Sequence, residues 1–330
     1  MNPAGWPHEL LDVFERSLTV EFATLTRAGA PVTVPTTPYV GADGSTLDVS
    51  TGLTYPGKAE RARRDPRVAL LFADPIGKDL TALPVVVVQG LATVRDSDLQ
   101  GNTDRYVRLN STKLPEATKG QPKAALRRMV WYYARIWVEI TPLHIRWWPD
   151  RDLSEPAQEW NAPEGTAAPL SDPAPPGARP GAWIAPPPSW RTVAEDALAR
   201  LPLCDLTVVG ANGFPLCLPA AGAELVDDGL RLRLGAGAPA LAAGPACLTM
   251  HAHPELFTGQ ENRTLVGSVS PENGHAHFRV ERALGDWSLA GNKLQVAVGF
   301  LSKGRVLRRR LRAEATRRAQ PVPRVRFPSE

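Results

Sequence analysis

The chain has 330 residues, of which 43% are hydrophobic and 22% charged, and its formal net charge is +4. This composition is typical of a folded globular protein, it excludes a disordered or collagen-like chain, and the length favours two domains. No apolar stretch is long enough to span a bilayer and the N-terminus has no secretory pattern, so we expect a cytoplasmic protein with no membrane partner.

The first half begins with a short helical pattern and continues as strands. In HELLDVFERSL, residues 8–18, the apolar residues recur on one face of a helix. The next segment, VEFATLTRAGAPVTVP at residues 20–35, has two apolar, β-branched runs about an Ala-Gly turn. That pattern predicts a β-hairpin.

A proline-rich segment follows the first half. Residues 150–190 contain closely spaced prolines, which remove backbone donors and restrict the preceding residue to extended conformations. We therefore predict an irregular connector between a first domain at residues 1–149 and a second at residues 191–330. Its tryptophans, Trp160, Trp183 and Trp190, predict that it packs against the surface of the domains.

The second half repeats the order of the first. A helical pattern at residues 192–203 is followed by a second hairpin, LCDLTVVGANGFPLCLP. If Gly29 is aligned with Gly213, Pro35 aligns with Pro219 without a gap. Residues 66–75 then correspond to residues 245–254, and Gly90 corresponds to Gly267. These matches in order indicate a duplicated all-β unit. The alternative is a chance similarity between two β-rich halves.

The first half resembles a known superfamily. The series ATLTRAGAPVTVPTTPYV, DGSTLDVSTG, KAERARRDPRVALLF and VVVQGLATV, closed by WVEITPLHIRWW, resembles the FMN-binding split β-barrel proteins. These are the pyridoxamine 5′-phosphate oxidase-like proteins and their deazaflavin-dependent oxidoreductase relatives. The resemblance covers about residues 8 to 149 well, and the second half shows it only through the repeat.

This resemblance implies a mainly β fold with short helices. Members of the superfamily are six-stranded antiparallel barrels that usually dimerise, with the cofactor in a cleft between two barrels. A tandem chain would supply both barrels itself as an internal pseudo-dimer, and would be either a monomer or a homodimer of such chains. The second, degenerate barrel would carry the basic C-terminal helix or tail.

The resemblance also implies a site for the cofactor phosphate. Ser50 and Thr51 end a strand, and Lys58 and Arg61 lie one turn apart at the start of the next helix. Hydroxyls, helix N-terminal amides and cationic side chains are the groups that bind a phosphate. The alternative for this segment is a charged loop between strands. For Arg63 and Arg64 we expect that at least one is solvated surface.

The same resemblance implies which residues lie beside the cofactor ring. Pro35, Thr36 and Thr37 correspond to a segment that lays backbone and hydroxyl groups along the isoalloxazine ring. Gln89 is in a strand that often lies beside the cofactor, or is otherwise a polar residue on an open strand face. The corresponding phosphate segment of the second half, LGAGAPALAAGPACLTM, has no basic residue. We therefore expect one cofactor site per chain.

Histidines of the second half form two His-x-His pairs, His251/His253 and His275/His277. Residues two apart in a strand point to the same face, so each pair can present two imidazoles together. If the strands are neighbours, the four imidazoles predict a metal or haem site; the alternatives are histidines that line the cleft for substrate, and ordinary surface histidines. Three cysteines, Cys204, Cys217 and Cys247, have no metal-binding spacing and are expected to be buried and unpaired.

The expected function is therefore a flavin-type oxidoreductase. It would use FMN, or the deazaflavin coenzyme F-420, for hydride transfer to or from an unidentified small molecule, and no side chain stands out as catalytic. The alternatives are a non-catalytic module that binds flavin or haem, and a metal site at the paired histidines. The basic tail, RVLRRRLRAEATRR, is expected to be an exposed helix, and no motif indicates a nucleic-acid partner.

Overall fold

The structure is a computed structural model that describes residues 5–74, 84–117, 119–178, 189–252, 261–272, 275–284, 287–288 and 293–327, with only the backbone described at 117, 287–288 and 293–303. The strands are β1 (Val20–Leu25), β2 (Pro31–Thr36), β3 (Pro38–Val40), β4 (Leu47–Gly52), β5 (Arg67–Phe72), β6 (Val85–Arg95), β7 (Arg135–Trp148), β8 (Gln158–Asn161), β9 (Leu203–Val209), β10 (Pro215–Pro219), β11 (Gly222–Val226), β12 (Gly229–Arg233), β13 (Gly244–Ala252), β14 (Glu261–Glu272), β15 (His275–Ala283) and β16 (Trp287–Ser288). The helices are α1 (His8–Arg16), α2 (Gly57–Arg64), α3 (Leu99–Lys113), the 3-10 helix η1 (Pro115–Ala117), α4 (Lys123–Arg127), α5 (Val130–Tyr133), α6 (Trp190–Arg200) and α7 (Lys293–Arg317).

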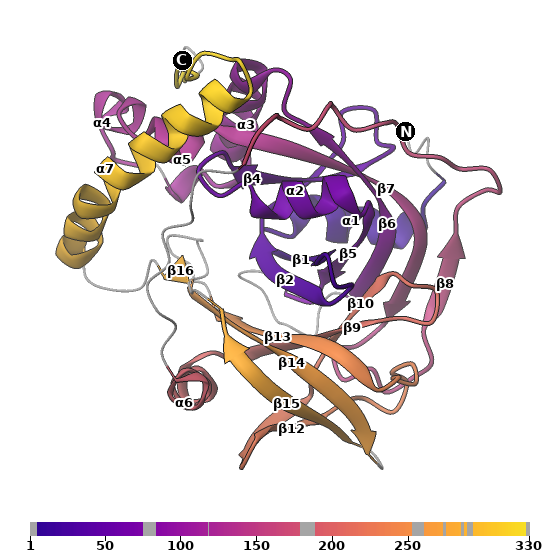
Figure 1. Cartoon of the computed structure of the whole chain (residues 1–330). Coiled ribbons are helices and arrows are strands. Elements are labelled where there is room, and N and C mark those ends of the chain that lie inside the picture. Colours follow the sequence, from indigo (N-terminus) through magenta and orange to yellow (C-terminus); the bar gives the residue numbers. More distant parts are fainter. Residues whose placement is uncertain are drawn as a thin grey trace.

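The strands form two antiparallel sheets that lie against each other (Figure 1). The first sheet has the order β2-β1-β5-β6-β7-β4-β3, and the second has the order β10-β9-β13-β14-β15-β12-β11. The second order is the first with every strand number raised by eight. We call β1–β7 the first barrel and β9–β15 the second barrel. The mainly β, two-barrel architecture predicted from the sequence is confirmed.

The first sheet curls around α2, as Figure 1 shows. Ala59 and Ala62 of α2 pack with Phe22, Leu70 and many other side chains of the strands in one hydrophobic core. A second core fills the second barrel and continues to the outer face of the first, where Ala23, Leu71 and Val87 join it. Strand β1 is therefore covered on both faces, which explains why all six of its residues are buried.

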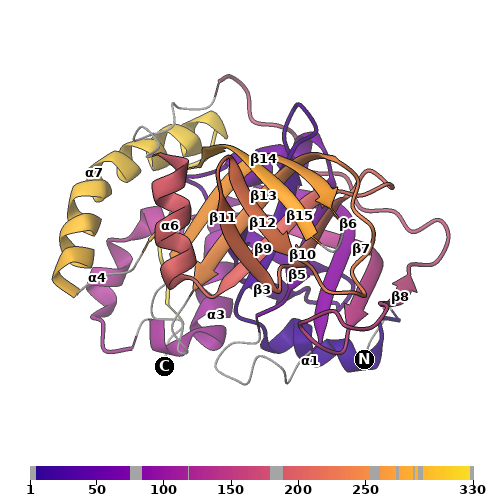
Figure 2. The same cartoon turned by 90° about the horizontal axis from the view of Figure 1, so that it is seen from below.

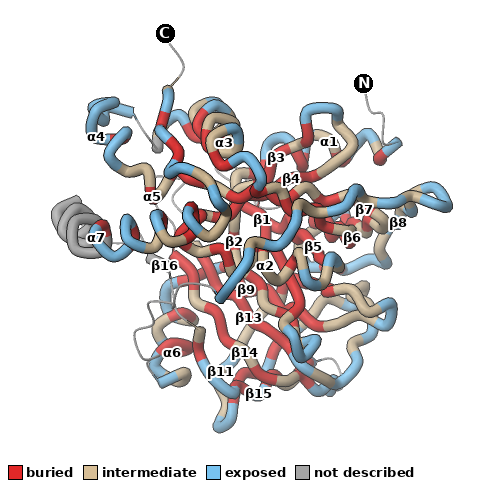
Figure 3. Tube along the Cα trace, turned by 45° about the horizontal axis from the view of Figure 1, so that its top comes forward, coloured by how far each residue is buried: buried red, intermediate tan, exposed pale blue. Residues whose placement is uncertain are grey.

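The two barrels meet through small polar groups as well as apolar ones, in the buried zone at the centre of Figure 3. The hydroxyl oxygens of Thr33 and Thr207 lie 2.7 Å apart, and the Thr249 hydroxyl donates to the Thr33 carbonyl at 3.2 Å. The Thr33 amide donates to the sulfur of Cys247 at 3.4 Å. All three cysteines are buried and free, as expected, and burial raises the pKa of the Cys247 thiol to about 11.

The C-terminal helix α7 packs on the first barrel. Leu307, Leu311 and Ala315 are buried in the core of the first barrel, and Figures 1 and 2 show α7 running beside α4 and away from the second sheet. The side chains of its basic residues Arg317 and Arg318 are only 9% and 2% exposed. The prediction of an exposed basic helix is therefore wrong for the last turns of α7, because they supply apolar and charged contacts to the other half of the chain.

The proline-rich connector lies along the first barrel. Strand β8 pairs with β7, and the Asp172 carboxylate accepts hydrogen bonds from the amides of Asp96 and Ser97 at 2.7 and 2.8 Å. The prediction that this segment packs against the domains is confirmed as far as residue 178; Trp183 lies outside the described residues. Within the part of the chain that the structure describes, no helix is both long and apolar enough to cross a membrane.

Candidate functional site

The turn after β4 fixes the start of α2. The Tyr55 amide donates to the Gly52 carbonyl at 2.8 Å, and the Thr51 hydroxyl donates to the Tyr55 carbonyl at 2.9 Å. Thr51 therefore stabilises the turn and has no proton left to donate to a ligand. Ser50 is also buried, but its hydroxyl makes no hydrogen bond to any residue that the structure describes. Ser50 is the strand-end hydroxyl that remains able to bind a ligand.

Three cationic side chains surround this turn, and we call Lys58, Arg61 and Arg135 the basic cluster. Arg61 donates from Nε to the Thr24 hydroxyl at 2.8 Å. Arg135 begins β7 and is paired with Gly52, so the sheet itself brings it to the end of β4. Sequence reasoning predicted Lys58 and Arg61 but missed Arg135, because a single arginine before an apolar strand carries no signal of its own.

Aromatic rings hold Arg135 in place. Its guanidinium lies 3.9 Å from the ring centroid of Tyr106 and 5.0 Å from that of Tyr132, and it donates to the Tyr106 hydroxyl at 2.8 Å. Its buried Nε has no hydrogen-bond partner among the described residues. Stacking of this kind restrains the planar group while leaving N–H donors for a ligand.

The electrostatics of the basic cluster favour an anion. Burial, together with the positive charges of Arg135 and Arg61, lowers the pKa of Lys58 to about 8, against the opposing charge of Glu21. In the described part of the chain no carboxylate lies within ion-pair distance of the Lys58 ammonium. No side chain caps the N-terminus of α2, so its first amides add further donors. Three half-buried cations side by side, of which Lys58 has no counter-ion among the described residues, are an environment that a phosphate would neutralise.

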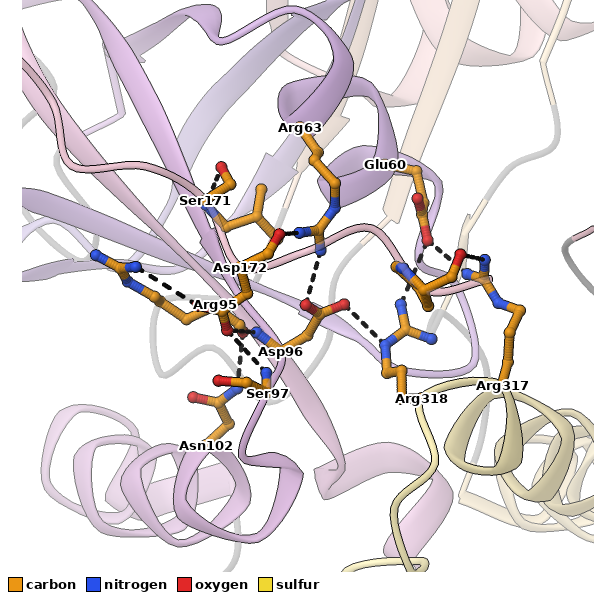
Figure 4. A network of polar contacts seen from close by, with 12 residues as sticks. Glu60, Arg63, Arg95, Asp96, Ser97, Asn102, Ser171, Asp172, Arg317 and Arg318 are labelled. Carbon is orange, nitrogen blue, oxygen red and sulfur yellow. Dashed lines mark hydrogen bonds and ion pairs between the residues drawn. The ribbon is translucent and has the colours of Figure 1, made fainter. Parts of the chain in front are cut away.

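A second network holds α2 from its other side (Figure 4). Arg63 makes an ion pair with Asp96 at 2.8 Å, and Glu60 pairs with Arg317 of α7 at 2.5 Å. Arg318 joins Asp96 and Glu60 at 2.8 and 3.3 Å. Arg63 is therefore structural. Arg64 is exposed, which confirms that at least one of these two arginines is surface.

The segment predicted to lie along the cofactor ring, residues 35–37, is beside Ser50 near the end of β4. Thr36 donates from its hydroxyl to the Ser50 carbonyl at 3.3 Å, which ties the end of β2 to β4. Pro35 is buried opposite Glu21, and Thr36 and Thr37 are half-buried. The structure therefore brings Pro35, Thr36 and Thr37 next to the strand-end residue Ser50.

Gln89, which the sequence resemblance places beside the cofactor, makes side-chain hydrogen bonds to the second barrel. Its side-chain nitrogen donates to the Pro215 carbonyl at 2.8 Å, and its side-chain oxygen accepts from Asn212 at 2.8 Å and lies 3.5 Å from His144. Both partners Asn212 and Pro215 belong to the β9–β10 hairpin of the second barrel. The structure gives Gln89 a role in joining the barrels, and these contacts occupy both ends of its amide group.

The corresponding place in the second barrel is filled by the connector. After β12, the chain passes Gly235 and Gly237 without forming a helix. A Cβ at Gly235 would overlap the carbonyl oxygen of Asp152, and one at Gly237 would overlap that of Glu155. Leu153 is fully buried here, and its carbonyl accepts a hydrogen bond from the Gly237 amide at 2.6 Å. Backbone carbonyls repel a phosphate, so these groups do not reproduce the environment of the turn after β4.

The histidine pairs do not converge. His251 is aligned with Asn262 on β14, whereas His277 is aligned with Ser270 on the same strand. Eight residues of strand separate the two positions, which is about 26 Å. His275 is exposed, His277 lies 2.8 Å from the Asp228 carboxylate, and His253 lies outside the described residues. The hypothesis that two pairs share one metal or haem is therefore wrong.

His251 instead meets two carboxylates between the barrels. Its Nε2 lies 3.0 Å from Oε1 of Glu21 and 3.3 Å from Oδ2 of Asp205, and all three side chains are almost fully buried. Burial raises the pKa of Glu21. Burial lowers the pKa of His251, but the two carboxylates outweigh it and raise that pKa to about 10. Sequence reasoning singled out His251 but not its partners.

Comparisons with known proteins give similarity in structure only. No family model and no curated protein matches the chain. Among solved structures, an F420 reductase is 20% identical, with 42% of this chain and 97% of that chain covered and a TM-score of 0.32. A conserved hypothetical protein of Mycobacterium tuberculosis is 25% identical, with 46% and 88% covered and a TM-score of 0.32. A pyridoxamine 5′-phosphate oxidase-related, FMN-binding protein of Nostoc punctiforme is 13% identical, with 44% and 86% covered and a TM-score of 0.31.

Proposed function

We propose that the chain is a flavin-type oxidoreductase, with one coenzyme site in the first barrel that the second barrel closes. The coenzyme is FMN or the deazaflavin coenzyme F-420, the two that the sequence resemblance implies. The observation that carries the proposal is the basic cluster: Lys58, Arg61 and Arg135 converge on the turn after β4, and Lys58 has no counter-ion within the described residues.

Each part of the site has a role in this proposal. The basic cluster and the first amides of α2 bind the phosphate, and the Ser50 hydroxyl donates to it. The backbone of Pro35 to Thr37 lies beside the ring and orients it. When bound, the coenzyme supplies hydride transfer at its central ring, and the protein supplies orientation and exclusion of water.

One site per chain follows from the second barrel. We infer that the two barrels are copies of one unit, because their strand orders correspond throughout. In the second copy the connector carbonyls of Asp152 and Glu155 lie where the first copy has its phosphate turn. The second barrel therefore acts as the partner that closes the site. We propose that the chain is a pseudo-dimer that needs no second chain to complete the site.

Equilibrium titration with FMN and with F-420, followed by absorbance and fluorescence, tests this proposal. Lys58→Ala should weaken binding of the preferred coenzyme by about 1.5–3 kcal/mol, the range for a charge-assisted hydrogen bond. The matched control is Arg308→Ala, which removes an exposed arginine from α7 and should leave the affinity unchanged. Equal losses in the two variants would contradict the site.

A second measurement separates an enzyme from a carrier. The bound coenzyme is reduced chemically, and its reoxidation by an added quinone is followed by absorbance. An oxidoreductase leaves the ring open to a second reactant, so reoxidation should be fast and should saturate with quinone concentration. Tight binding without reoxidation would instead support the alternative of a non-catalytic flavin-binding module. A Soret band in the purified protein would favour haem.

A further inference from the structure

The buried triad of Glu21, Asp205 and His251 shares no residue with the basic cluster and has no role assigned in the proposed function. Glu21 is on β1 of the first barrel, whereas Asp205 and His251 are on the paired strands β9 and β13 of the second. One donor atom from each side chain lies within 4.8 Å of the other two. The three side chains are each about 2% exposed or less. The triad exists only where both barrels meet.

The contacts within the triad leave Glu21 unsatisfied. An imidazole has at most one proton on Nε2, and this proton cannot point at two carboxylates at once. Neither carboxylate oxygen of Glu21 accepts a hydrogen bond from the described residues, and Oδ1 of Asp205 accepts none either. One imidazolium can balance only one of two buried carboxylates, and the other is strongly unfavourable unless a further cation balances it.

The separations within the triad match those around a bound metal ion. Zinc binds imidazole nitrogen and carboxylate oxygen at about 2.0–2.2 Å, so two ligand atoms on a tetrahedral ion lie roughly 3.3 Å apart and on an octahedral ion roughly 2.9 Å apart. The distances from His251 Nε2 to the oxygens of Glu21 and Asp205 are 3.0 and 3.3 Å. An ion could therefore take the place of the Nε2 proton with small movements of the side chains.

We propose that Glu21, Asp205 and His251 bind one divalent transition-metal ion that joins the two barrels. One imidazole and two carboxylates make a mixed nitrogen and oxygen donor set, which suits zinc and also manganese or ferrous iron. Two negative ligands and a neutral imidazole balance the charge of a divalent ion. The ion would satisfy the oxygens that have no other partner, and it would cross-link strands that are distant in sequence.

The test uses zinc alone and the full-length protein. Wild type and the variants Glu21→Gln, His251→Asn and His277→Ala are produced in zinc-supplemented medium, passed through gel filtration, and analysed for zinc by mass spectrometry. Glu21→Gln keeps the shape of the side chain but removes its charge. His277→Ala removes a histidine of the same barrel that lies outside the triad, and it controls for surface binding.

We expect about one zinc per chain in wild type and in His277→Ala, and a loss of most of it in Glu21→Gln and His251→Asn. We also expect chelation to lower the midpoint of thermal unfolding in wild type but not in Glu21→Gln. This comparison does not need His251→Asn, so it stays informative if that variant fails to fold. Wild type without zinc, or equal zinc in wild type and Glu21→Gln, would overturn the proposal. Neither outcome depends on coenzyme binding, so the proposed function can stand or fail separately.

Discussion

Gly90 and Gly267 occupy matching positions at matching irregularities of the two sheets. The register of β6 with β7 shifts between Gln89 and Gly90, and the register of β14 with β15 shifts between Val266 and Gly267. A Cβ at Gly90 would overlap the Thr141 carbonyl oxygen, and a Cβ at Gly267 would overlap that of Arg279. Each barrel therefore bends at a β-bulge where only glycine fits.

Alanine at either glycine should destabilise the protein. We expect Gly90→Ala and Gly267→Ala each to lower the free energy of unfolding by at least about 1–3 kcal/mol, because the added methyl meets backbone that cannot move aside cheaply. Gly244→Ala, at the start of β13, is the control because a Cβ there meets nothing within 4 Å. Denaturant unfolding measures all three. A loss at Gly244 as large as at Gly267 would contradict the argument from close approach.

The buried arginine of α7 should matter for stability. Arg318 is 2% exposed and pairs with Asp96 and Glu314, which are themselves buried. Arg318→Ala would leave Asp96 paired only with Arg63 and Glu314 paired only with Arg317, so we expect a loss of about 1.5–3 kcal/mol. Arg308→Ala, on the exposed face of the same helix, should change stability by less than about 0.5 kcal/mol. Thermal or denaturant unfolding of the two variants measures whether α7 stabilises the first barrel through Arg318. Equal stability of the two variants would contradict this role.

Gln89 should stabilise the contact between the barrels and have little effect on the coenzyme. Gln89→Leu removes hydrogen bonds to Pro215 and Asn212 and leaves their polar groups unpaired, so we expect a loss of about 1–3 kcal/mol of stability. The affinity for FMN should change less than twofold. A weakened affinity with unchanged stability would instead favour the role beside the coenzyme that the sequence resemblance implies.

The lowered pKa of Lys58 predicts opposite effects of pH on stability and on coenzyme binding. The pKa is about 8 in the folded protein and about 10.4 for an ordinary unfolded lysine, so between these values the unfolded chain binds the additional proton. The contribution of Lys58 to stability without coenzyme therefore rises as pH increases from 8 to about 10.4. Phosphate binding needs the charged ammonium, so affinity for the coenzyme should fall above pH 8, by up to about tenfold per pH unit.

Denaturant midpoints at pH 7.5 and pH 10 measure the first effect. Lys113, whose pKa burial also lowers to about 8, contributes in the same window, so the comparison is between wild type, Lys58→Met and Lys113→Met. Each variant should lose part of the rise in stability. Only Lys58→Met should also lose the pH dependence of coenzyme affinity.

The local structure of this chain follows closely from its sequence. Periodicity predicted helical segments at residues 8–18 and 192–203, and the structure has helices at residues 8–16 and 190–200. Both hairpins were predicted, and their turn residues Gly29 and Gly213 have the positive φ angles that such turns require. The repeat alignment was wrong by one residue in one strand. The register places Val68 opposite Gly90 and Ala246 opposite Gly267, so Pro66 corresponds to Gly244 and not to Pro245.

The contacts between distant segments could not be predicted. Arg135 reaches the turn after β4 only through the pairing of β7 with β4, and 77 residues separate it from Lys58. The triad needs the packing of β1 against the β9 and β13 pair, and a lone glutamate in the apolar run VEFATL does not predict it. The loss of basic residues after β12 was visible in the sequence, but the filling of that position by the connector was not.

The affinity of the wild-type protein for FMN compared with riboflavin tests the central claim most directly. Riboflavin has the same ring and ribityl chain but lacks the phosphate, so the ratio of the two dissociation constants isolates what the basic cluster contributes. Isothermal titration should give one FMN per chain and an affinity at least about tenfold higher than for riboflavin, with a difference that largely disappears in Lys58→Ala. Equal affinities for FMN and riboflavin in the wild type would show that Lys58, Arg61 and Arg135 do not bind a coenzyme phosphate.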